Sequence, residues 1–232
     1  MGRAAAQDIA SSIKTFLTNQ PVVRIIFAAA PSQADVLENL TTEEDIDWSR
    51  VVAFHMDEYI GLPPESSQRF GNWLKVRIFD RLPFNRVHII SPEENPKNSA
   101  NKYSKLLNEA PIDIICLGIG TNGHLAFNDP LDTDFADSED VKVVPLDAIN
   151  RRQQVDDGCF KNLNSVPKTA ITLTIPMLMS AKKMFCVVPG EAKRQAVWRT
   201  LNDPITPSCP STTLRTHSGC NFYVDNGSNP ER

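Results

Sequence analysis

The chain lacks several features that would place it in a specialised class of protein. It has no apolar run near the roughly 20 residues that span a bilayer, and its N-terminal residues do not have the pattern of a signal peptide. Lys and Arg are spread along the chain, without the basic block that is typical of nucleic-acid surfaces. We therefore expect a cytoplasmic protein that binds neither a membrane nor a nucleic acid.

The cysteine residues do not have the pattern of a zinc site or a redox motif. The five cysteines are odd in number and include no pair with C-x-x-C spacing, which is the spacing of many zinc sites and redox motifs. Cys116 and Cys186 lie within apolar, strand-like runs. We interpret the cysteines as reduced, mostly buried thiols, and we expect neither a bound metal nor a cysteine nucleophile.

The composition that remains is that of an ordinary globular protein. Of the 232 residues, 41% are hydrophobic and 22% are charged, which suffices for a sizeable buried core. No internal repeat, low-complexity segment or linker divides the chain, so we expect one domain over residues 1–232. The net charge of −4 does not exclude a small anionic ligand, because a few local cations suffice to bind one.

Segments typical of strands and of helices alternate along the chain. Short apolar runs, many of them rich in β-branched residues, predict strands over 22–28, 51–56, 86–90, 112–117, 141–146, 169–174, 184–188 and 221–225. Apolar residues at helical spacing predict helices at the N-terminus and over 31–40, 69–79, 98–107, 175–181 and 191–201. The polar segment 151–162 has no such pattern, and we interpret it as a lid or binding loop.

This alternation predicts an α/β fold. We expect a doubly wound, mostly parallel sheet with helices on both faces, in the three layers of a Rossmann-like fold. The run 112–117 is apolar almost throughout, which favours a central strand covered on both faces. In such sheets, ligands bind beyond the carboxyl ends of the strands. The residues that follow each predicted strand are therefore the first candidates for a site.

Three strand ends carry polar candidates. Ser32 and Gln33 open a helix after the first strand and can donate hydrogen bonds to a phosphate. Lys193 lies in the first turn of another helix, where the helix dipole favours a bound anion. Asp57 and Glu58 follow the second strand and could contact a ligand or act on it as a base. A helix cap, a solvated turn or a surface lysine is the ordinary alternative at each position.

A fourth strand end is the glycine-rich loop 118–130. Gly118, Gly120 and Gly123 permit sharp turns and let backbone N–H groups approach a ligand closely. His124 follows them, with Asp129 shortly after. A carboxylate that reaches an imidazole fixes its tautomer and raises its basicity, which is how a general acid or base is built. A tight turn with a structural histidine is the alternative.

In this order, these segments resemble one family. Residues 56–63 (Met-Asp-Glu-Tyr-Ile-Gly-Leu-Pro), 118–130 (Gly-Ile-Gly-Thr-Asn-Gly-His-Leu-Ala-Phe-Asn-Asp-Pro) and the stretch 167–193 are similar to the glucosamine-6-phosphate deaminase (isomerase) family, whose wider group includes 6-phosphogluconolactonases. The similarity extends over nearly the whole chain. The Ala-Phe-Asn-Asp-Pro ending of the loop resembles the deaminase branch, whereas the lactonase branch usually has an Ala-Ser-Leu-Phe-Pro type of ending.

The resemblance implies an enzyme that converts glucosamine 6-phosphate to fructose 6-phosphate and ammonia, with no metal or organic cofactor. His124 would help to open the sugar ring, and Asp57 would move a proton between C2 and C1 before ammonia leaves from C2. Asp129 matches the family's acidic residue that orients this histidine, and Lys193 matches a phosphate-binding lysine.

Three positions depart from the better-known members of the family. Asn122 stands where they have Asp, so it can hold the histidine by a hydrogen bond but adds no negative charge. The loop after the first strand reads Ala-Ala-Pro-Ser-Gln instead of a Gly-Gly/Ser-Thr-Pro type, so Ser32 and Gln33 would bind the phosphate. The segment Asn-Arg-Arg-Gln-Gln offers Arg152, or else Arg151, as the arginine that grips phosphate.

These departures leave three hypotheses open. The first is an amino hexose 6-phosphate deaminase and isomerase, with the particular amino sugar undecided. The second is a 6-phosphogluconolactonase-like hydrolase, which uses the histidine loop but needs no proton transfer between carbons. The third is a sugar-phosphate-binding protein without catalysis, suggested by Asn122 and the altered phosphate loop. A homo-oligomer is compatible with all three.

Overall fold

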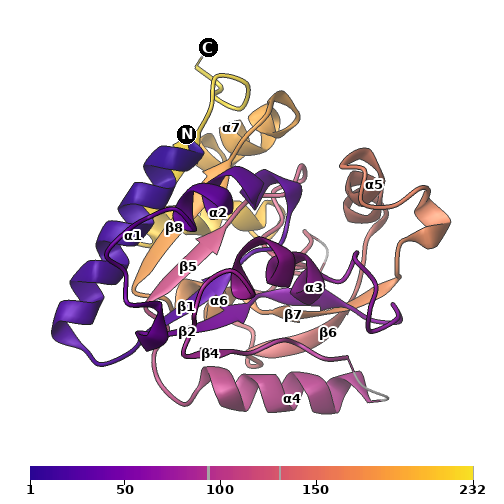
Figure 1. Ribbon diagram of the computed structural model, residues 1–232. Coiled ribbons are helices and arrows are strands. Elements are labelled where there is room, and N and C mark those ends of the chain that lie inside the picture. Colours follow the sequence, from indigo (N-terminus) through magenta and orange to yellow (C-terminus); the bar gives the residue numbers. More distant parts are fainter. Residues whose placement is uncertain (93–94, 131, 232) are drawn as a thin grey trace.

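A parallel sheet runs through the centre of the protein (Figure 1). The structure, a computed structural model, describes residues 1–92, 95–130 and 132–231. Among these residues, six strands pair side by side in the order β4 (Arg86–Val87), β2 (Val51–His55), β1 (Val23–Phe27), β5 (Ile114–Leu117), β8 (Lys183–Val188) and β9 (Cys220–Val224). Each strand is parallel to its neighbours. β1 and β5 are buried throughout and lie in the middle, which confirms the predicted central strand.

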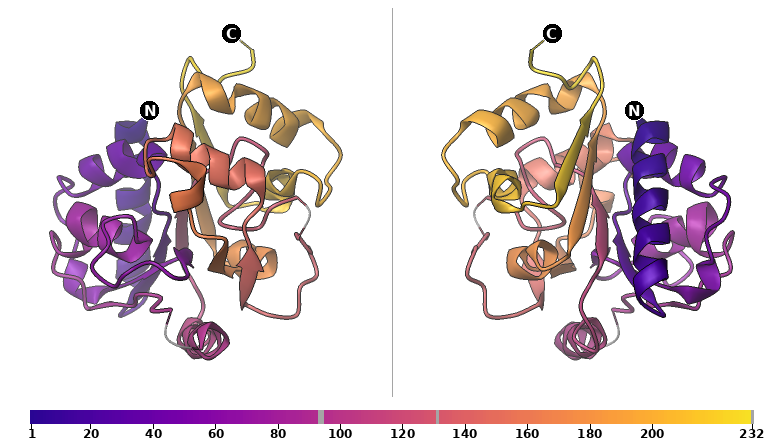
Figure 2. Two further views of the ribbon diagram at one scale, coloured as in Figure 1. Left: turned by 90° about the vertical axis from the view of Figure 1, so that its right-hand side faces the viewer. Right: turned by 90° about the vertical axis from the view of Figure 1, so that its left-hand side faces the viewer.

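Helices cover both faces of this sheet, as predicted. One face packs against α1 (Gly2–Asn19), α2 (Ala34–Leu40) and α3 (Phe70–Leu74). The opposite face packs against α4 (Pro96–Leu107), α6 (Ile175–Met179) and α7 (Arg194–Asn202). Figure 2 shows α1 and α7 on opposite sides of the sheet. The described residues include no helix long and apolar enough to cross a membrane.

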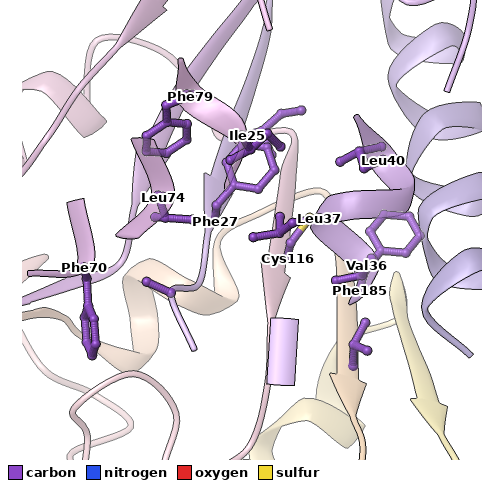
Figure 3. Packing of buried hydrophobic residues seen from close by; sticks show 14 of the residues in the cluster. Ile25, Phe27, Val36, Leu37, Leu40, Phe70, Leu74, Phe79, Cys116 and Phe185 are labelled. Atoms are coloured by element: carbon purple, nitrogen blue, oxygen red, sulfur yellow. The ribbon is translucent and has the colours of Figure 1, made fainter. Parts of the chain in front are cut away.

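The core follows from the alternation of side chains along each strand. In β1, Ile25 and Phe27 belong to the cluster under α1 and α2, whereas Ile26 belongs to the cluster on the other face. Figure 3 shows the first cluster, where the rings of Phe27 and Phe79 meet edge to face at 5.8 Å between centroids. Burying one such side chain contributes about 1.5–3 kcal/mol, so this packing holds the central strands in place.

A second, smaller sheet stands beside the first. It is antiparallel and has the order β3 (Asp57–Tyr59), β7 (Thr169–Leu173) and β6 (Val141–Pro145). The strands predicted over 141–146 and 169–174 therefore form, but outside the parallel sheet in which we expected them. A single residue, Met56, separates β2 from β3. The chain leaves the parallel sheet there, and Asp57 pairs with Thr172 of the smaller sheet instead.

Other predicted elements need correction. The helix predicted over 69–79 consists of α3 followed by a π-helical turn, η3 (Lys75–Phe79). The strand predicted over 86–90 is only two residues long. Short 3-10 turns complete the chain: η1 (Pro31–Gln33), η2 (Trp48–Arg50), η4 (Leu163–Ser165), η5 (Glu191–Lys193) and η6 (Pro210–Thr216).

The segment that we interpreted as an irregular loop contains a helix. α5 (Ala148–Asp156) begins before the segment 151–162 and extends through its first half. Only Asn150 and Gln154 of this helix are buried, and they are four residues apart on one face. Because both are polar, a search for apolar residues at helical spacing could not detect the helix.

Candidate active site

A cavity of about 440 Å³ lies at the carboxyl edge of the parallel sheet. It is lined by the residues that follow five of the strands: 28–33 after β1, 56–57 after β2, 118–120 after β5, 189–193 after β8 and Asp225 after β9. Phe70 and Phe127, whose rings stack at 5.6 Å, add an apolar wall. The cavity is therefore where ligands bind in sheets of this kind.

His124 lines the cavity and is held from behind. Its ring lies directly against Gly120, where any Cβ would overlap it. Its Nδ1 lies 2.8 Å from Asn122 Oδ1 and 3.4 Å from Asp129 Oδ1. Burial, and then the positive charge of Lys193, lower the pKa of His124 to about 3, so the free imidazole is neutral. Its Nε2 has no hydrogen-bond partner among the described residues.

Asp129 lies behind His124 and does not line the cavity. Both of its oxygens accept hydrogen bonds from Asn150 Nδ2, at 3.1 and 3.2 Å, and Oδ1 also accepts from Asn122 Nδ2 at 3.3 Å. Burial, and then the charge of Asp147, raise the pKa of Asp129 to about 6. The arrangement brings together the histidine, amide and carboxylate that the loop sequence predicted as neighbours.

Asp57 lines the cavity from the start of β3. It is 6% exposed, and its carboxyl group has no hydrogen-bond partner in the part of the chain that the structure describes. Burial, and then the charge of Glu58, raise its pKa well above the usual range for aspartate. A carboxylate that the protein leaves unsolvated in this way is a strong candidate for proton transfer.

Lys193 lines the cavity from η5, at the start of the segment that leads into α7. It is 7% exposed, and its side chain has no ion-pair or hydrogen-bond partner within residues 1–92, 95–130 and 132–231. Burial lowers its pKa to about 8. A buried lysine without a partner is costly to the free protein, so this position suits a ligand that brings negative charge.

Ser32 and Gln33 line the same cavity from η1. The Nε2 of Gln33 donates to the backbone oxygen of Val187 at 3.1 Å, which ties this turn to β8. A Cβ on Gly118 would lie 3.0 Å from that Nε2 and 3.6 Å from Ser32 Oγ. The glycine therefore lets both polar side chains come close to the His124 loop.

The structure gives Glu58 a structural position instead of the substrate contact that we expected. Its carboxylate accepts hydrogen bonds from the backbone N–H groups of Tyr59 (2.9 Å), Phe70 (3.0 Å) and Gly71 (3.0 Å), and it does not line the cavity. The N–H groups of Phe70 and Gly71 lie in the first turn of α3, where the helix itself offers no acceptor. Glu58 therefore caps that helix. The ordinary alternative, a helix cap, holds at this position.

Gly123 and Arg152 also lie outside the cavity. Gly123 has φ +87°, and a Cβ there would lie 2.6 Å from Cys209 Sγ, so the glycine serves the packing of the loop. Arg152 is exposed on α5, and the alternative Arg151 donates to the backbone oxygens of Leu163 and Val166. Neither arginine is placed to grip a phosphate in this cavity.

Sequence reasoning missed the contribution of α5 and its ends to the site. Gln153, Gln154 and Asp157 line the cavity, and Asp147 and Asn150 reach the group behind His124. The signal in the sequence was the spacing of these polar residues, three and four positions apart, which places them on one face of a helix. A search based on the spacing of apolar residues does not detect it. Across the described residues, no group of three or more His, Cys, Asp or Glu side chains is arranged to hold a metal ion.

Known proteins resemble this chain along most of its length. The family described as glucosamine-6-phosphate isomerases/6-phosphogluconolactonase matches residues 1–222. A glucosamine-6-phosphate deaminase from Staphylococcus epidermidis is 32% identical over 237 residues, covering 99% of this chain and 96% of the relative. One from an Exiguobacterium species is 32% identical over 184 residues, covering 79% and 70%.

Solved structures agree with the sequence comparison. A monomeric glucosamine-6-phosphate deaminase superposes with a TM-score of 0.89 at 25% identity, covering 98% of this chain and 93% of the other. A 6-phosphogluconolactonase from Thermotoga maritima has the same fold, with a TM-score of 0.75 at 18% identity and coverage of 94% and 92%. The match over 222 of 232 residues and the shared fold show that this chain belongs to the glucosamine-6-phosphate isomerase/6-phosphogluconolactonase family.

Proposed function

We propose that this protein is a glucosamine-6-phosphate deaminase, which converts the amino sugar phosphate and water to fructose 6-phosphate and ammonia. The observation that carries the proposal is the set of three groups around one cavity: a neutral His124, an unpartnered Asp57 and an unpartnered Lys193. The relatives named as deaminases, at 32% identity, support the same activity. All five cysteines are free thiols, which supports the cytoplasmic location that we also propose.

The phosphate group is placed at the Lys193 side of the cavity. The lysine is the cation there, and Ser32 and Gln33 supply further polar groups from η1. A dianionic phosphate stabilises the charged form of Lys193, because an opposite charge nearby raises a lysine pKa that burial has lowered. Binding of the phosphate therefore fixes one end of the sugar and positions C1 and C2 for reaction.

Ring opening is assigned to His124. The proton must leave the C1 hydroxyl and reach the ring oxygen, so the catalyst has to accept a proton and then donate it. In the neutral imidazole, Nε2 has no partner among the described residues and is free to accept this proton, while Nδ1 is held by Asn122 and Asp129. Asp129 stabilises the imidazolium that forms between the two transfers.

Isomerisation is assigned to Asp57. Its carboxylate removes the proton from C2 and returns it to C1, which leaves an imine at C2. Water adds to that carbon and ammonia departs, so the atoms balance as one water consumed for one ammonia released. The buried, unpartnered position makes the ionised carboxylate a stronger base than a solvated one. A lactonase has no need of this group, which is why Asp57 favours the deaminase over the hydrolase.

The test is a substrate panel with matched variants. Wild-type protein is given glucosamine 6-phosphate, galactosamine 6-phosphate and 6-phosphogluconolactone in D₂O, and ammonia, ketose phosphate and acid release are measured. We expect ammonia and fructose 6-phosphate with deuterium at C1, and a loss of about 10²–10⁴-fold in kcat for Asp57→Asn. Asp156→Asn, which removes an exposed acid from α5, serves as the control. Lactone hydrolysis without ammonia would establish the hydrolase instead, and binding without any product would establish a non-catalytic protein.

A further inference from the structure

A network of side chains behind His124 includes a residue that the proposed mechanism does not yet use. Asp147 caps the N-terminus of α5, where its Oδ1 accepts from the backbone N–H of Asn150 at 2.6 Å. Its other oxygen, Oδ2, accepts from Asn122 Nδ2 at 3.5 Å. Asn150 is fully buried and donates in turn to both oxygens of Asp129. The start of α5 is thereby joined to the loop that carries the histidine.

Only one orientation of the Asn122 amide fits its surroundings. Its Nδ2 faces two carboxylates, Asp129 at 3.3 Å and Asp147 at 3.5 Å, and an ionised carboxylate can only accept hydrogen bonds. The NH₂ group must therefore point toward them, and Oδ1 must point toward His124. There Oδ1 accepts from the backbone N–H at 3.0 Å and lies 2.8 Å from Nδ1.

The amide orientation decides the tautomer of His124. A carboxamide oxygen has no proton to give, so the 2.8 Å contact requires that Nδ1 carries the hydrogen. In a neutral imidazole, Nε2 then keeps its lone pair. That lone pair is what ring opening needs, because the first step accepts a proton from a hydroxyl group of the substrate.

We propose that Asp147 is a positioning residue, whose carboxylate holds the Asn122 amide and through it the Nδ1–H tautomer of His124. The proposal rests on the role in ring opening proposed above for His124. Asp147 does not line the cavity, so it acts on the reaction only through these neighbours. It replaces part of the negative charge that a carboxylate at position 122 would bring to the histidine, because Asn122 itself is neutral.

Asp147 also acts on the charge of Asp129. The titratable groups that face Asp129 are Asp147 from the start of α5 and His124 from its own loop, with Lys193 acting on that histidine from η5. Asp147 is the second cause, after burial, of the raised pKa of Asp129. Removing its charge lowers that pKa, so the part of the acidic limb of the kcat profile that belongs to Asp129, as distinct from the part that belongs to Asp57, moves to lower pH.

Two variants separate this role from simple helix capping. Asp147→Asn and Asp147→Ser both keep a good N-cap, but neither offers a carboxylate to Asn122. We expect kcat for glucosamine 6-phosphate to fall roughly tenfold, as for the loss of one hydrogen bond to a charged group, with KM unchanged and the acidic limb at lower pH. Asp156→Asn removes the same charge from the exposed face of the same helix and should leave kcat and the limb unchanged. A limb that stays in place, with or without a lower kcat, would reduce Asp147 to a structural cap.

Nitrogen-15 NMR of the histidine side chains tests the tautomer without any turnover. The chain has four histidines, and the signals of His124 are assigned by their loss in His124→Gln. We expect the Nδ1–H form in the wild-type protein and a mixture with the Nε2–H form in Asp147→Asn. An Nε2–H form in the wild type, or an unchanged tautomer in both Asp147 variants, overturns the proposal. If the wild type does not turn over any amino hexose phosphate, the proposed function fails, while this measurement still decides on Asp147.

Discussion

Lys193 is expected to make the free protein less stable than the same protein without it. Burial lowers its pKa from 10.5 to about 8 against the opposing charge of Asp157, and its side chain has no ion-pair or hydrogen-bond partner among the described residues. A pKa difference of that size corresponds to a charging cost of roughly 3 kcal/mol. Lys193→Met keeps most of the alkyl chain and removes the charge. We expect a gain of about 1–3 kcal/mol in the free energy of unfolding near neutral pH, the lower values applying if the site rearranges.

The sign of the pH dependence follows from the same shift. Because the pKa of Lys193 is lower in the folded protein, the unfolded chain binds more protons between pH 8 and pH 10.5, and folding becomes more favourable as the pH rises through that window. The cost is present in full below about pH 8 and is absent above about pH 10.5. The stability advantage of Lys193→Met should therefore shrink over this range.

Urea unfolding at neutral and at alkaline pH measures the effect, with Lys183→Met as the control for an exposed lysine. Inorganic phosphate should stabilise the wild type but not Lys193→Met, since it binds where the lysine charge is needed. The wild type should be the more active of the two proteins. The KM of Lys193→Met for glucosamine 6-phosphate should be about a hundredfold higher, as for the loss of a charged contact. A variant that is no more stable than the wild type at neutral pH, or an advantage that does not change with pH, would refute the reasoning.

Three further predictions concern other parts of the site. The kcat profile should fall as the pH drops toward about 6, because burial raises the pKa of Asp129 to about 6 and raises the pKa of Asp57 well above the usual range for aspartate; a limb near the ordinary value of 3.8 in a pH–rate series would contradict this. Gly123→Ala should cost about 2–4 kcal/mol in urea unfolding, since it adds a clash with Cys209 to a positive φ, and a loss no larger than that of Gly158→Ala, which has positive φ but open space, would remove the clash as the cause. Glu58→Gln should lower stability by about 1–3 kcal/mol through the cap of α3 while KM stays constant; a raised KM at unchanged stability would restore a substrate contact.

The sequence was informative wherever the fold and the site depend on local pattern. Apolar runs predicted the buried strands of the parallel sheet, and the rule that ligands bind at the carboxyl ends of such strands led to Ser32, Asp57, His124 and Lys193, which all line the cavity. Each of these residues lies in the segment that follows a strand of the parallel sheet, so its place in the fold needs no knowledge of distant contacts.

The failures have a common physical cause, which is that the deciding interaction lies far away in the sequence. Glu58 follows the same strand as Asp57, but the amides that occupy its carboxylate belong to α3. Alternation along strands cannot show that β7 pairs with β3 instead of joining the parallel sheet. Nor can composition show that Asn150 and Gln154 of α5 are buried, because the group that accepts from the Asn150 Nδ2 is Asp129, which lies 21 residues earlier in the sequence.

The cavity contains two groups whose electrostatic requirements the protein itself does not meet. Lys193 is a buried cation that forms no ion pair among the described residues and whose pKa stays lowered despite the charge of Asp157, and Asp57 is a buried acid without a donor. Lys193 lies in η5 after β8 and Asp57 lies at the start of β3, and the two form no ion pair with each other in the part of the chain that the structure describes. A ligand with a phosphate at one end and an acidic C–H beside an amino group at the other supplies what each lacks. An amino sugar phosphate has both a phosphate and an amino group, whereas a lactone phosphate lacks the amino group, and this difference is why the deaminase fits the free protein better than the hydrolase.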